Sequence, residues 1–338
     1  MRFSQQRANV LSAAYLASLG QSAQAFPLGG GFKLTADQAA LSVSITKANK
    51  TVWSTAPGQN FISASSGVDT ITGTDGNFKI TPVDDNKCGS MNITKVGLES
   101  RSQAKPGKGV AISGFLNECG DASAPYTAHF WVSSDLPDRV SWDVSVTADT
   151  AAADPLNKVF LTYSSAADED FYGLGAQSSF ASLKGQNVPI FSREQGVGRG
   201  DEPTTSVMNY VNPFSGGDFF TTYTAIPQYV STTNTAFYLD EGLAALANFD
   251  FTKDDSVTIR YTQLSVSGQV LRANSMLDAI GKVTDYTGKM EPLPKWVDDG
   301  AILGIQGGQE KVEKIVKQAA DVDCPIVGAW LQDWSVAT

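Results

Sequence analysis

Histidine and cysteine are scarce in this sequence of 338 residues, which has one His and three Cys. The histidine is His129, and the cysteines are Cys88, Cys119 and Cys324. These side chains do not occur at the spacings that are typical of zinc sites, and a single histidine does not favour a His-dependent nucleophile. We therefore expect no metal site and no cofactor, so any acid–base chemistry must come from carboxylates.

Positive charge is also scarce. Lys and Arg number 25 against 35 Asp and Glu, so the formal net charge is -10, and no cluster of basic residues stands out. A protein that binds nucleic acid neutralises phosphates with clustered Lys and Arg, so we expect no nucleic-acid partner. Hydrophobic residues make up 42% of the chain and charged residues 18%, which indicates a folded rather than a disordered chain.

The apolar run near the amino terminus, Val10 to Gly20, is too short to span a membrane, which takes about 20 residues. It follows Arg2 and Arg7 and precedes Ala23-Gln24-Ala25, which has small residues at both cleavage-recognition positions. This pattern predicts a secretory signal peptide over residues 1–25. We therefore expect a secreted, extracellular protein without a membrane anchor.

A secreted chain can keep disulfides and carry glycans. An oxidising compartment favours a disulfide between Cys88 and Cys119, because both lie in the strand-rich part and are 31 positions apart (119 − 88 = 31). Cys324 would then have no partner. The sequons that begin at Asn49 and Asn92 are acceptor sequences for N-glycosylation.

Residues 26–290 are predicted to form one domain of short β-strands. Apolar and polar residues alternate with period two in several segments, which is typical of sheets with one buried face. Regular spacing and polar turns favour a large antiparallel β-sandwich. The predicted strands are Leu41 to Lys47, Phe78 to Thr81, His129 to Val132, Val140 to Val146, Val159 to Tyr163, Ala236 to Leu239 and Val257 to Tyr261.

The pattern changes to a helical period after Asn274. Ser275 and Asp278 have the spacing of an acidic capping box, which predicts a helix that begins there and runs to Gly288. Its predicted apolar stripe is formed by Met276, Leu277, Ile280 and Val283. Two prolines between Met290 and Trp296 then predict a linker, and we place the domain boundary there.

Residues 291–338 predict the start of a second domain. Two short apolar runs, Ala301 to Ile305 and Ile326 to Leu331, flank a stretch that has apolar residues at helical spacing from Val312 to Ala319. A strand, a helix and a strand in this order form a βαβ unit, whose strands are parallel.

Polar and aromatic residues follow both predicted strands of this unit. Gln306 comes directly after the first strand, and Gln332, Asp333 and Trp334 follow the second. The carboxyl ends of parallel strands share one edge, which carries the ligand site in parallel α/β folds and barrels. We therefore expect a binding site at this edge. The alternative is that these residues only cap a turn and solvate a strand end.

A glycine-rich stretch, Phe171 to Pro203, interrupts the strand pattern. It places charged residues, among them Arg193, Glu194 and Arg199, between glycines that permit unusual turns. We interpret it as a functional loop, and the alternative is a long solvated loop. A phosphate-binding loop is rejected, because the Lys-Ser/Thr ending and the strand–helix context are missing.

Several motifs occur in a fixed order along the chain. They are Y-G-L-G-A-Q, F-S-R-E-Q-G-V-G-R, G-G-D-F-F, I-P-Q-Y-V-S-T, L-P-K-W, G-I-Q-G-G and W-L-Q-D-W. With them the sequence resembles glycoside hydrolase family 31, and most of all its sulfoquinovosidase branch, from Phe171 to Trp334. The resemblance implies a mainly β chain: a large antiparallel, galactose-mutarotase-like β-sandwich followed by the first βαβ unit of a truncated (β/α)8 TIM barrel.

The resemblance also implies an activity, that of a retaining α-glycosidase with one aspartate as nucleophile and another as general acid/base. Gln306 and Gln332 would bind the sulfonated sugar, with Trp334 as an apolar wall. Glu194 and Arg199 would belong to a sandwich loop that closes over the barrel mouth. Ordinary α-glucosidases have an aspartate for the sugar 4-hydroxyl where this chain has the leucine of W-L-Q-D-W, which favours the sulfoquinovosidase branch.

The family's two catalytic aspartates belong to later barrel strands. From Gly300 onward the sequence has 39 residues (338 − 300 + 1), whereas a complete barrel takes about 250. We therefore expect no catalytic residue in this chain and no activity from it alone. The expected partner is a carbohydrate, an α-glycoside with a sulfonated sugar. Two alternatives stay open: an α-glucosidase that acts on neutral sugars, and a non-catalytic sugar-binding remnant.

Overall fold

The structure, a computed structural model, divides into two units. Contacts between residues assign Met1–Val283 to the first unit and Thr284–Thr338 to the second. No helix in the described part of the chain is long and apolar enough to cross a membrane. The structure describes residues 23–74, 76–100, 108–120, 122–194, 196–240 and 246–331.

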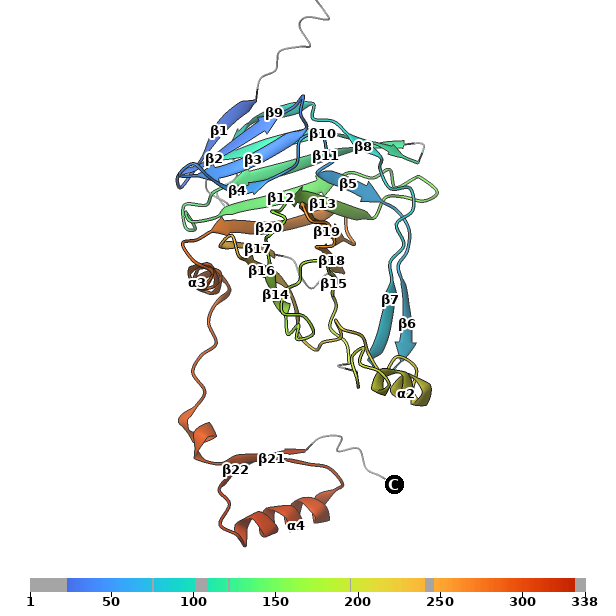
Figure 1. The fold of residues 1–338 in the computed structure, drawn as a ribbon, viewed down its shortest axis with the longest axis vertical. Helices are drawn as coiled ribbons and strands as arrows, with labels where there is room; N and C mark the ends of the chain where they lie inside the picture. Colours follow the sequence, from blue (N-terminus) through green and yellow to red (C-terminus); the bar gives the residue numbers. More distant parts are fainter. Residues whose placement is uncertain are drawn as a thin grey trace, which may run out of the picture. The chain divides into compact units, whose positions relative to one another are not determined.

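Antiparallel sheets build the first unit, which confirms the fold class that the strand pattern predicts (Figure 1). The largest sheet has nine strands and runs through the middle of the unit. Its order is β14 (Phe171–Gly175), β16 (Ala225–Ser231), β17 (Thr235–Leu239), β20 (Ser265–Arg272), β12 (Val140–Val146), β11 (Ala122–Trp131), β10 (Lys108–Cys119) and β8 (Ser90–Met91), with β9 (Lys95–Ser100) also paired to β10.

Three further sheets complete the first unit. The five-stranded sheet has the order β15 (Asn187–Ile190), β18 (Ala247–Asp250), β19 (Ser256–Tyr261), β13 (Lys158–Ser164) and β5 (Ile62–Ser65). The four-stranded sheet is formed by β1 (Gln24–Gly29), β2 (Phe32–Asp37), β3 (Ser42–Lys47) and β4 (Lys50–Ser54). The hairpin of β6 (Thr70–Thr74) and β7 (Asn77–Thr81) makes a two-stranded sheet of its own.

One continuous apolar core joins the three larger sheets. In β12 the buried side chains Val140, Trp142, Val144 and Val146 recur with period two, because alternate residues of a strand face one side of the sheet. The rings of Trp142 and Phe237 stack with their centroids 5.4 Å apart. Burial of one apolar side chain of this kind stabilises the fold by roughly 1.5–3 kcal/mol. The shared core therefore stabilises the packing of the three sheets against one another.

The cysteine pair of the first unit is joined. A disulfide links Cys88 and Cys119 with an S–S distance of 2.00 Å, and Cys324 is exposed and free. The disulfide ties the end of β10 to the segment that leads into β8. The two sequon asparagines, Asn49 and Asn92, are both exposed.

Helix α3 (Met276–Thr287) begins at the predicted cap but buries a different face. The backbone N–H of Asp278 donates to Ser275 Oγ (3.1 Å), and the Asp278 carboxylate accepts from the N–H of Asn274 (2.9 Å). The buried residues are Ala279 and Val283, which pack against Val230, Ala236, Tyr238 and Leu271. The predicted stripe is therefore only partly correct. Val283 is buried as predicted, but the helix also docks through the small side chain of Ala279, and Leu277 is 80% exposed.

The second unit is the predicted βαβ unit. A short 3-10 helix, η1 (Lys295–Asp299), precedes β21 (Ala301–Ile305), α4 (Gln309–Ala320) and β22 (Ile326–Leu331). Strands β21 and β22 pair in parallel, with Ile305 opposite Leu331. Ile305 is buried, whereas Ile302 is 52% and Trp330 65% exposed, since two strands and one helix cannot close a barrel.

We predict that the purified 338-residue chain binds a hydrophobic dye and is cut by protease near Met290 to Trp296. Exposed apolar strand faces attract such dyes, and this segment carries the exposed side chains Met290, Leu293 and Trp296 without a strand around them. Dye fluorescence and mass spectrometry of the fragments measure both effects. Protection of this segment together with the absence of dye binding would contradict the prediction.

Candidate functional site

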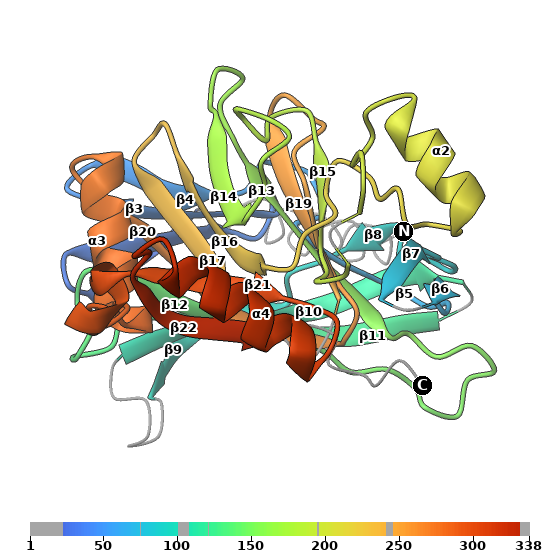
Figure 2. The same cartoon turned by 90° about the horizontal axis from the view of Figure 1, so that it is seen from below.

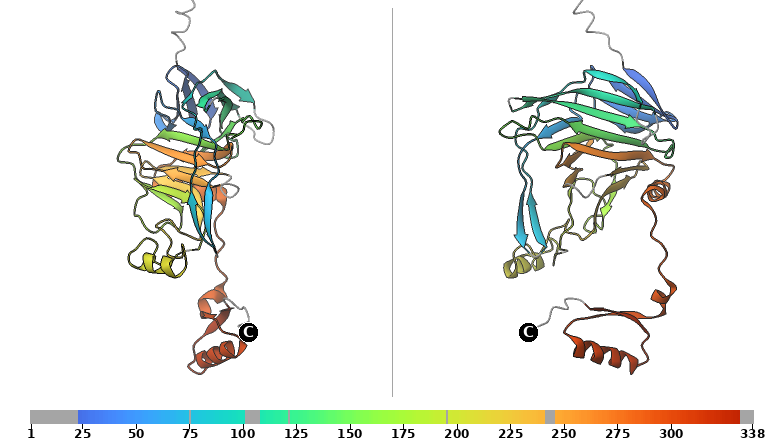
Figure 3. Two further views of the ribbon diagram at one scale, coloured as in Figure 1. Left: turned by 90° about the vertical axis from the view of Figure 1, so that its right-hand side faces the viewer. Right: turned by 180° about the vertical axis from the view of Figure 1, so that it is seen from behind.

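The hairpin β6–β7 extends from the sheets to the glycine-rich stretch and ends beside α2 (Thr204–Val211), as the views in Figures 1, 2 and 3 agree. Hydrogen bonds join its end to that stretch. The N–H of Glu194 donates to the carbonyl of Gly76 (2.9 Å), and Arg193 Nη1 donates to the carbonyl of Phe78 (2.6 Å). The hairpin thus supports a loop that lies more than 100 positions away in the sequence.

One guanidinium holds the base of this hairpin. Arg260, on β19, donates from Nη1 and Nη2 to the carboxylate of Asp69 (2.9 and 2.6 Å) and from Nε to Asp84 (2.8 Å). Asp69 directly precedes β6, and Asp84 follows β7. Because the two aspartates flank the hairpin, Arg260 fixes both of its ends to the sandwich.

The ion pair at the hairpin base is buried, and its charges are strongly stabilised. Burial alone would raise the pKa of Asp69, but hydrogen bonds from Arg260 and from the N–H of Val83, with the charges of Arg260 and Lys158, lower it below the usual value. Burial alone would lower the pKa of Arg260, but Asp69 and Asp84 raise it. Both groups are therefore charged at neutral pH.

Two glycine motifs of the loop region pack backbone against backbone. Gly196 has φ +76°, and a Cβ added to it would lie 2.7 Å from the Cα of Gly217. The N–H of Arg199 donates to the carbonyl of Gly216 (2.8 Å), and the N–H of Val197 donates to that of Ser215 (2.8 Å). Only glycine allows this approach, which explains why F-S-R-E-Q-G-V-G-R and G-G-D-F-F occur together.

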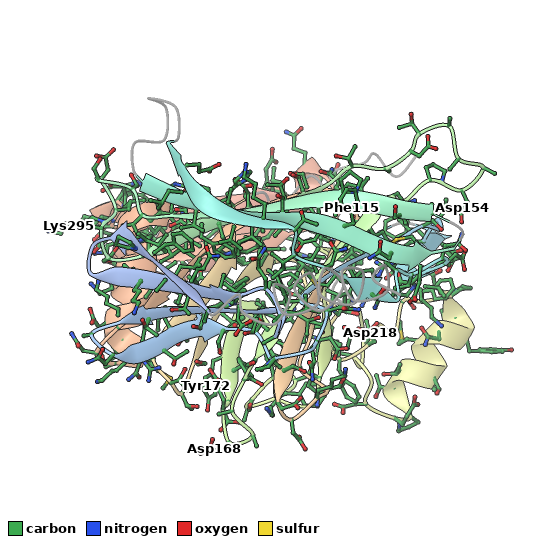
Figure 4. The ribbon with its side chains drawn as sticks, turned by 90° about the horizontal axis from the view of Figure 1, so that it is seen from above. Phe115, Asp154, Asp168, Tyr172, Asp218 and Lys295 are labelled. Carbon is green, nitrogen blue, oxygen red and sulfur yellow. A yellow bond between two sulfur atoms is a disulfide. The ribbon has the colours of Figure 1, made fainter. Side chains whose placement is uncertain are left out.

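A salt bridge also joins these two motifs. Arg193 Nη2 lies 2.6 Å from one carboxylate oxygen of Asp218 and 2.7 Å from the other. Asp218, labelled in Figure 4, also accepts a hydrogen bond from the N–H of Phe220 (2.9 Å). The motif aspartate therefore orients Arg193, which in turn binds the hairpin through Phe78.

Glu194 offers an accessible carboxylate. Its side chain is exposed, and one oxygen accepts a hydrogen bond from the hydroxyl of Tyr223 at 2.8 Å. An ionised carboxylate has about four acceptor positions, so acceptor capacity remains for the hydroxyls of a sugar. Gly76 lies so close to this side chain that an added Cβ would be 2.6 Å from Glu194 Cγ.

Arg199 lies in the left-handed region, with φ +48°, and its side chain is half-buried. Its Nε and Nη2 atoms are buried, and no described residue accepts a hydrogen bond from them. Buried guanidinium nitrogens normally have acceptors. Arg199 therefore has donor capacity that the described residues do not use.

The predicted strand-end residues belong to the second unit. Gln306 is exposed and directly follows β21. Gln332 and Trp334 lie outside the described residues. Glu194 and Arg199 belong to the first unit.

The described residues do not form a metal site: they contain no group of three or more His, Cys, Asp and Glu side chains that could hold a metal ion. The acid/base groups around the loop are instead carboxylates. Glu194 is exposed on it, and Asp218 is engaged by Arg193.

Comparisons with known proteins show what the chain is similar to. No family model matches the chain. A sulfoquinovosidase of Escherichia coli (strain K12) is 29% identical over 179 residues, which are 53% of this chain and 26% of that protein. A sulfoquinovosidase of Agrobacterium fabrum is 26% identical over 196 residues, 58% of this chain and 29% of that protein. The chain resembles the sulfoquinovosidases. It spans less than a third of the length of either relative.

Solved structures show the same fold. A sulfoquinovosidase of family GH31 from E. rectale, in complex with the aza-sugar inhibitor IFGSQ, superposes with a TM-score of 0.70 and 23% identity, over 89% of this chain and 41% of that one. An α-N-acetylgalactosaminidase from Bifidobacterium bifidum gives a TM-score of 0.51 at 11% identity, over 92% of this chain and 52% of that one. The resemblance to glycoside hydrolase family 31, expected from the motifs, is confirmed.

The sequence did not predict three features of the glycine-rich loop and its surroundings. These are the support from the hairpin, the salt bridge from Asp218 to Arg193, and helix α2. The only sequence signal for the hairpin support and for the salt bridge was the fixed order of the motifs, which groups charged and glycine-rich segments in one family pattern. It does not say which segments touch.

We predict that Gly196→Ala loosens the loop. The added Cβ would meet the backbone of Gly217, so hydrogen exchange at the N–H groups of Val197 and Arg199 should accelerate. The matched control is Gly58→Ala, because Gly58 has a similar φ (+73°) with no atom within 4 Å of the added Cβ. Equal exchange rates at the loop in both variants would contradict the contact.

We predict that Asp69→Asn destabilises the first unit at neutral pH by on the order of 3 kcal/mol, because it removes the more buried of the two carboxylates that pair with the buried Arg260 and leaves only Asp84. The pKa of Asp69 in the folded state lies below its ordinary 3.8, so the ion pair stabilises the fold above that pH and is lost as the pH falls through the lower value.

Urea unfolding as a function of pH measures this effect. The loss of stability below about pH 4 should be weaker in Asp69→Asn than in the parent chain. Asp285→Asn is the control, because its ion pair with Lys289 is exposed. An acid dependence in Asp69→Asn equal to that of the parent chain would contradict the role of Asp69.

Proposed function

We propose that this chain is the amino-terminal part of a secreted, retaining α-glycosidase that hydrolyses the O-glycosyl bond of α-sulfoquinovosides in carbohydrate metabolism. The observation that carries the proposal is the supported loop. Its motifs match the sulfoquinovosidase pattern, and it holds an accessible carboxylate, Glu194, on a rigid backbone. Side chains on a backbone that is already held in place favour sugar recognition, because less conformational freedom is lost on binding.

In this proposal, which rests on the family resemblance, residues of both units contribute to sugar recognition. Gln306, Gln332 and Trp334 belong to the barrel edge, where neutral amides bind sulfonate oxygens or their water without adding negative charge. Glu194 and Arg199 contribute from the sandwich loop. The nucleophile and the general acid/base are aspartates of later barrel strands, and carboxyl groups about 5 Å apart suit a double displacement.

Secretion is part of the proposal. It is supported by the signal-peptide pattern of residues 1–25, by the Cys88–Cys119 disulfide and by exposed sequons at Asn49 and Asn92.

The proposed activity is tested with 4-nitrophenyl α-sulfoquinovoside and 4-nitrophenyl α-glucoside as competing substrates. We expect no turnover by the 338-residue chain, and turnover of the sulfonated substrate in preference by a protein that continues through a complete barrel. Hydrolysis by the 338-residue chain would show that catalytic carboxylates are present in it. A preference for the glucoside would favour an α-glucosidase.

The role of the loop is tested by Glu194→Gln in the protein with a complete barrel. Loss of a hydrogen bond to a charged group costs about 1.5–3 kcal/mol, so kcat/KM should fall by roughly ten- to a hundredfold. Glu202→Gln is the control, because the carboxylate of Glu202 accepts from the N–H of Ser206 at the start of α2. Equal kcat/KM values in Glu194→Gln and the parent would contradict the proposed contact.

A further inference from the structure

A cavity lies in the first unit, and it is distinct from the loop that carries Glu194. Its volume is about 300 Å³, and strands β4, β13, β14, β16 and β17 and the end of β20 contribute to its walls. Of the loop from Arg193 to Arg199, the residues that the structure describes do not line it. Asp168 and Tyr172, which flank its wall residues Glu169 and Phe171 in the sequence, lie apart from Asp218 in Figure 4.

Four of the residues that line this cavity are aromatic. They are Trp53, Tyr163, Phe171 and Tyr229, all of which belong to the buried core. Trp53 and Tyr163 have ring centroids 5.9 Å apart, and the hydroxyls of Tyr163 and Tyr229 are hydrogen-bonded at 2.8 Å. These aromatic side chains are therefore already packed before a ligand binds.

Two opposite charges stand at the cavity without pairing. Glu169 accepts hydrogen bonds from Thr233 Oγ1 (2.9 Å) and from the N–H of Ala166 (3.2 Å). Arg272 donates from Nη1 to the carbonyl of Thr51 (2.6 Å). Among the described residues, neither Glu169 nor Arg272 forms an ion pair, so each keeps acceptor or donor positions for a ligand.

We propose that this cavity binds one neutral sugar residue. Its volume is at the lower end of the roughly 300–1,000 Å³ of small-molecule pockets, which suits a single ring. Its lining offers apolar surface to the C–H groups of a sugar, while a carboxylate accepts from its hydroxyls and a guanidinium donates to them. One charge of each sign favours a neutral polyol over an anion. This site is separate from the proposed glycosidase site and does not depend on it.

The proposal is tested with methyl α-D-glucopyranoside as the probe and the 338-residue chain as the protein. We expect saturable binding in the millimolar range by saturation-transfer NMR. The indole N–H resonance of Trp53, assigned by its loss in Trp53→Phe, should shift with the same dissociation constant. Absence of saturable binding, or binding that leaves this resonance unmoved, would overturn the proposal.

Variants separate this cavity from the loop site. Glu169→Gln should weaken binding on the order of tenfold, because a charged acceptor becomes neutral. Glu202→Gln should leave the affinity unchanged, because Glu202 is not among the residues that line the cavity. Near-UV circular dichroism checks that Glu169→Gln keeps its core, and Thr235→Val supplies a second substitution in the wall, with a smaller expected loss. Weakened binding in Glu194→Gln with unchanged binding in Glu169→Gln would place the sugar at the loop and overturn the proposal.

Discussion

The guanidinium of Arg260 is the contact on which the candidate site depends. It joins Asp69 and Asp84 at the two ends of the hairpin β6–β7, and that hairpin reaches the glycine-rich loop. A two-stranded hairpin alone is marginally stable in water. The buried ion pair therefore gives the hairpin a fixed direction, and through Gly76 it gives Glu194 a fixed place.

The same logic explains the composition of the loop. Gly196 and Gly217 bring two backbones closer than any side chain would allow, while Arg193 and Asp218 close the contact with opposite charges. Glu194 and Arg199 are thus carried by a loop whose backbone is held by three segments: the hairpin, the G-G-D-F-F segment and the start of α2. A loop so held keeps its geometry before a ligand arrives.

The sequence predicted the regular parts well. Ala301–Ile305 and Ile326–Leu331 were predicted with the bounds that β21 and β22 have, because continuous apolar runs end at glycine or proline there. Contacts between distant segments could not be predicted: neither the hairpin support nor the buried face of α3 follows from local periodicity. Helix α2 was missed, since T-T-S-V-M-N-Y-V is rich in residues of low helix propensity. The sugar-binding roles of Gln332 and Trp334 stay predictions.

The most direct test of the central claim is a crystal structure of the protein continued through a complete barrel, with a sulfoquinovose-like inhibitor bound. The claim is that the hairpin-supported loop contributes to the sugar site. We predict the Glu194 carboxylate within hydrogen-bonding distance of a sugar hydroxyl, on a loop that still bonds to Gly76 and Gly216. A bound sugar contacted by barrel residues alone, with Glu194 turned to solvent, would contradict the account.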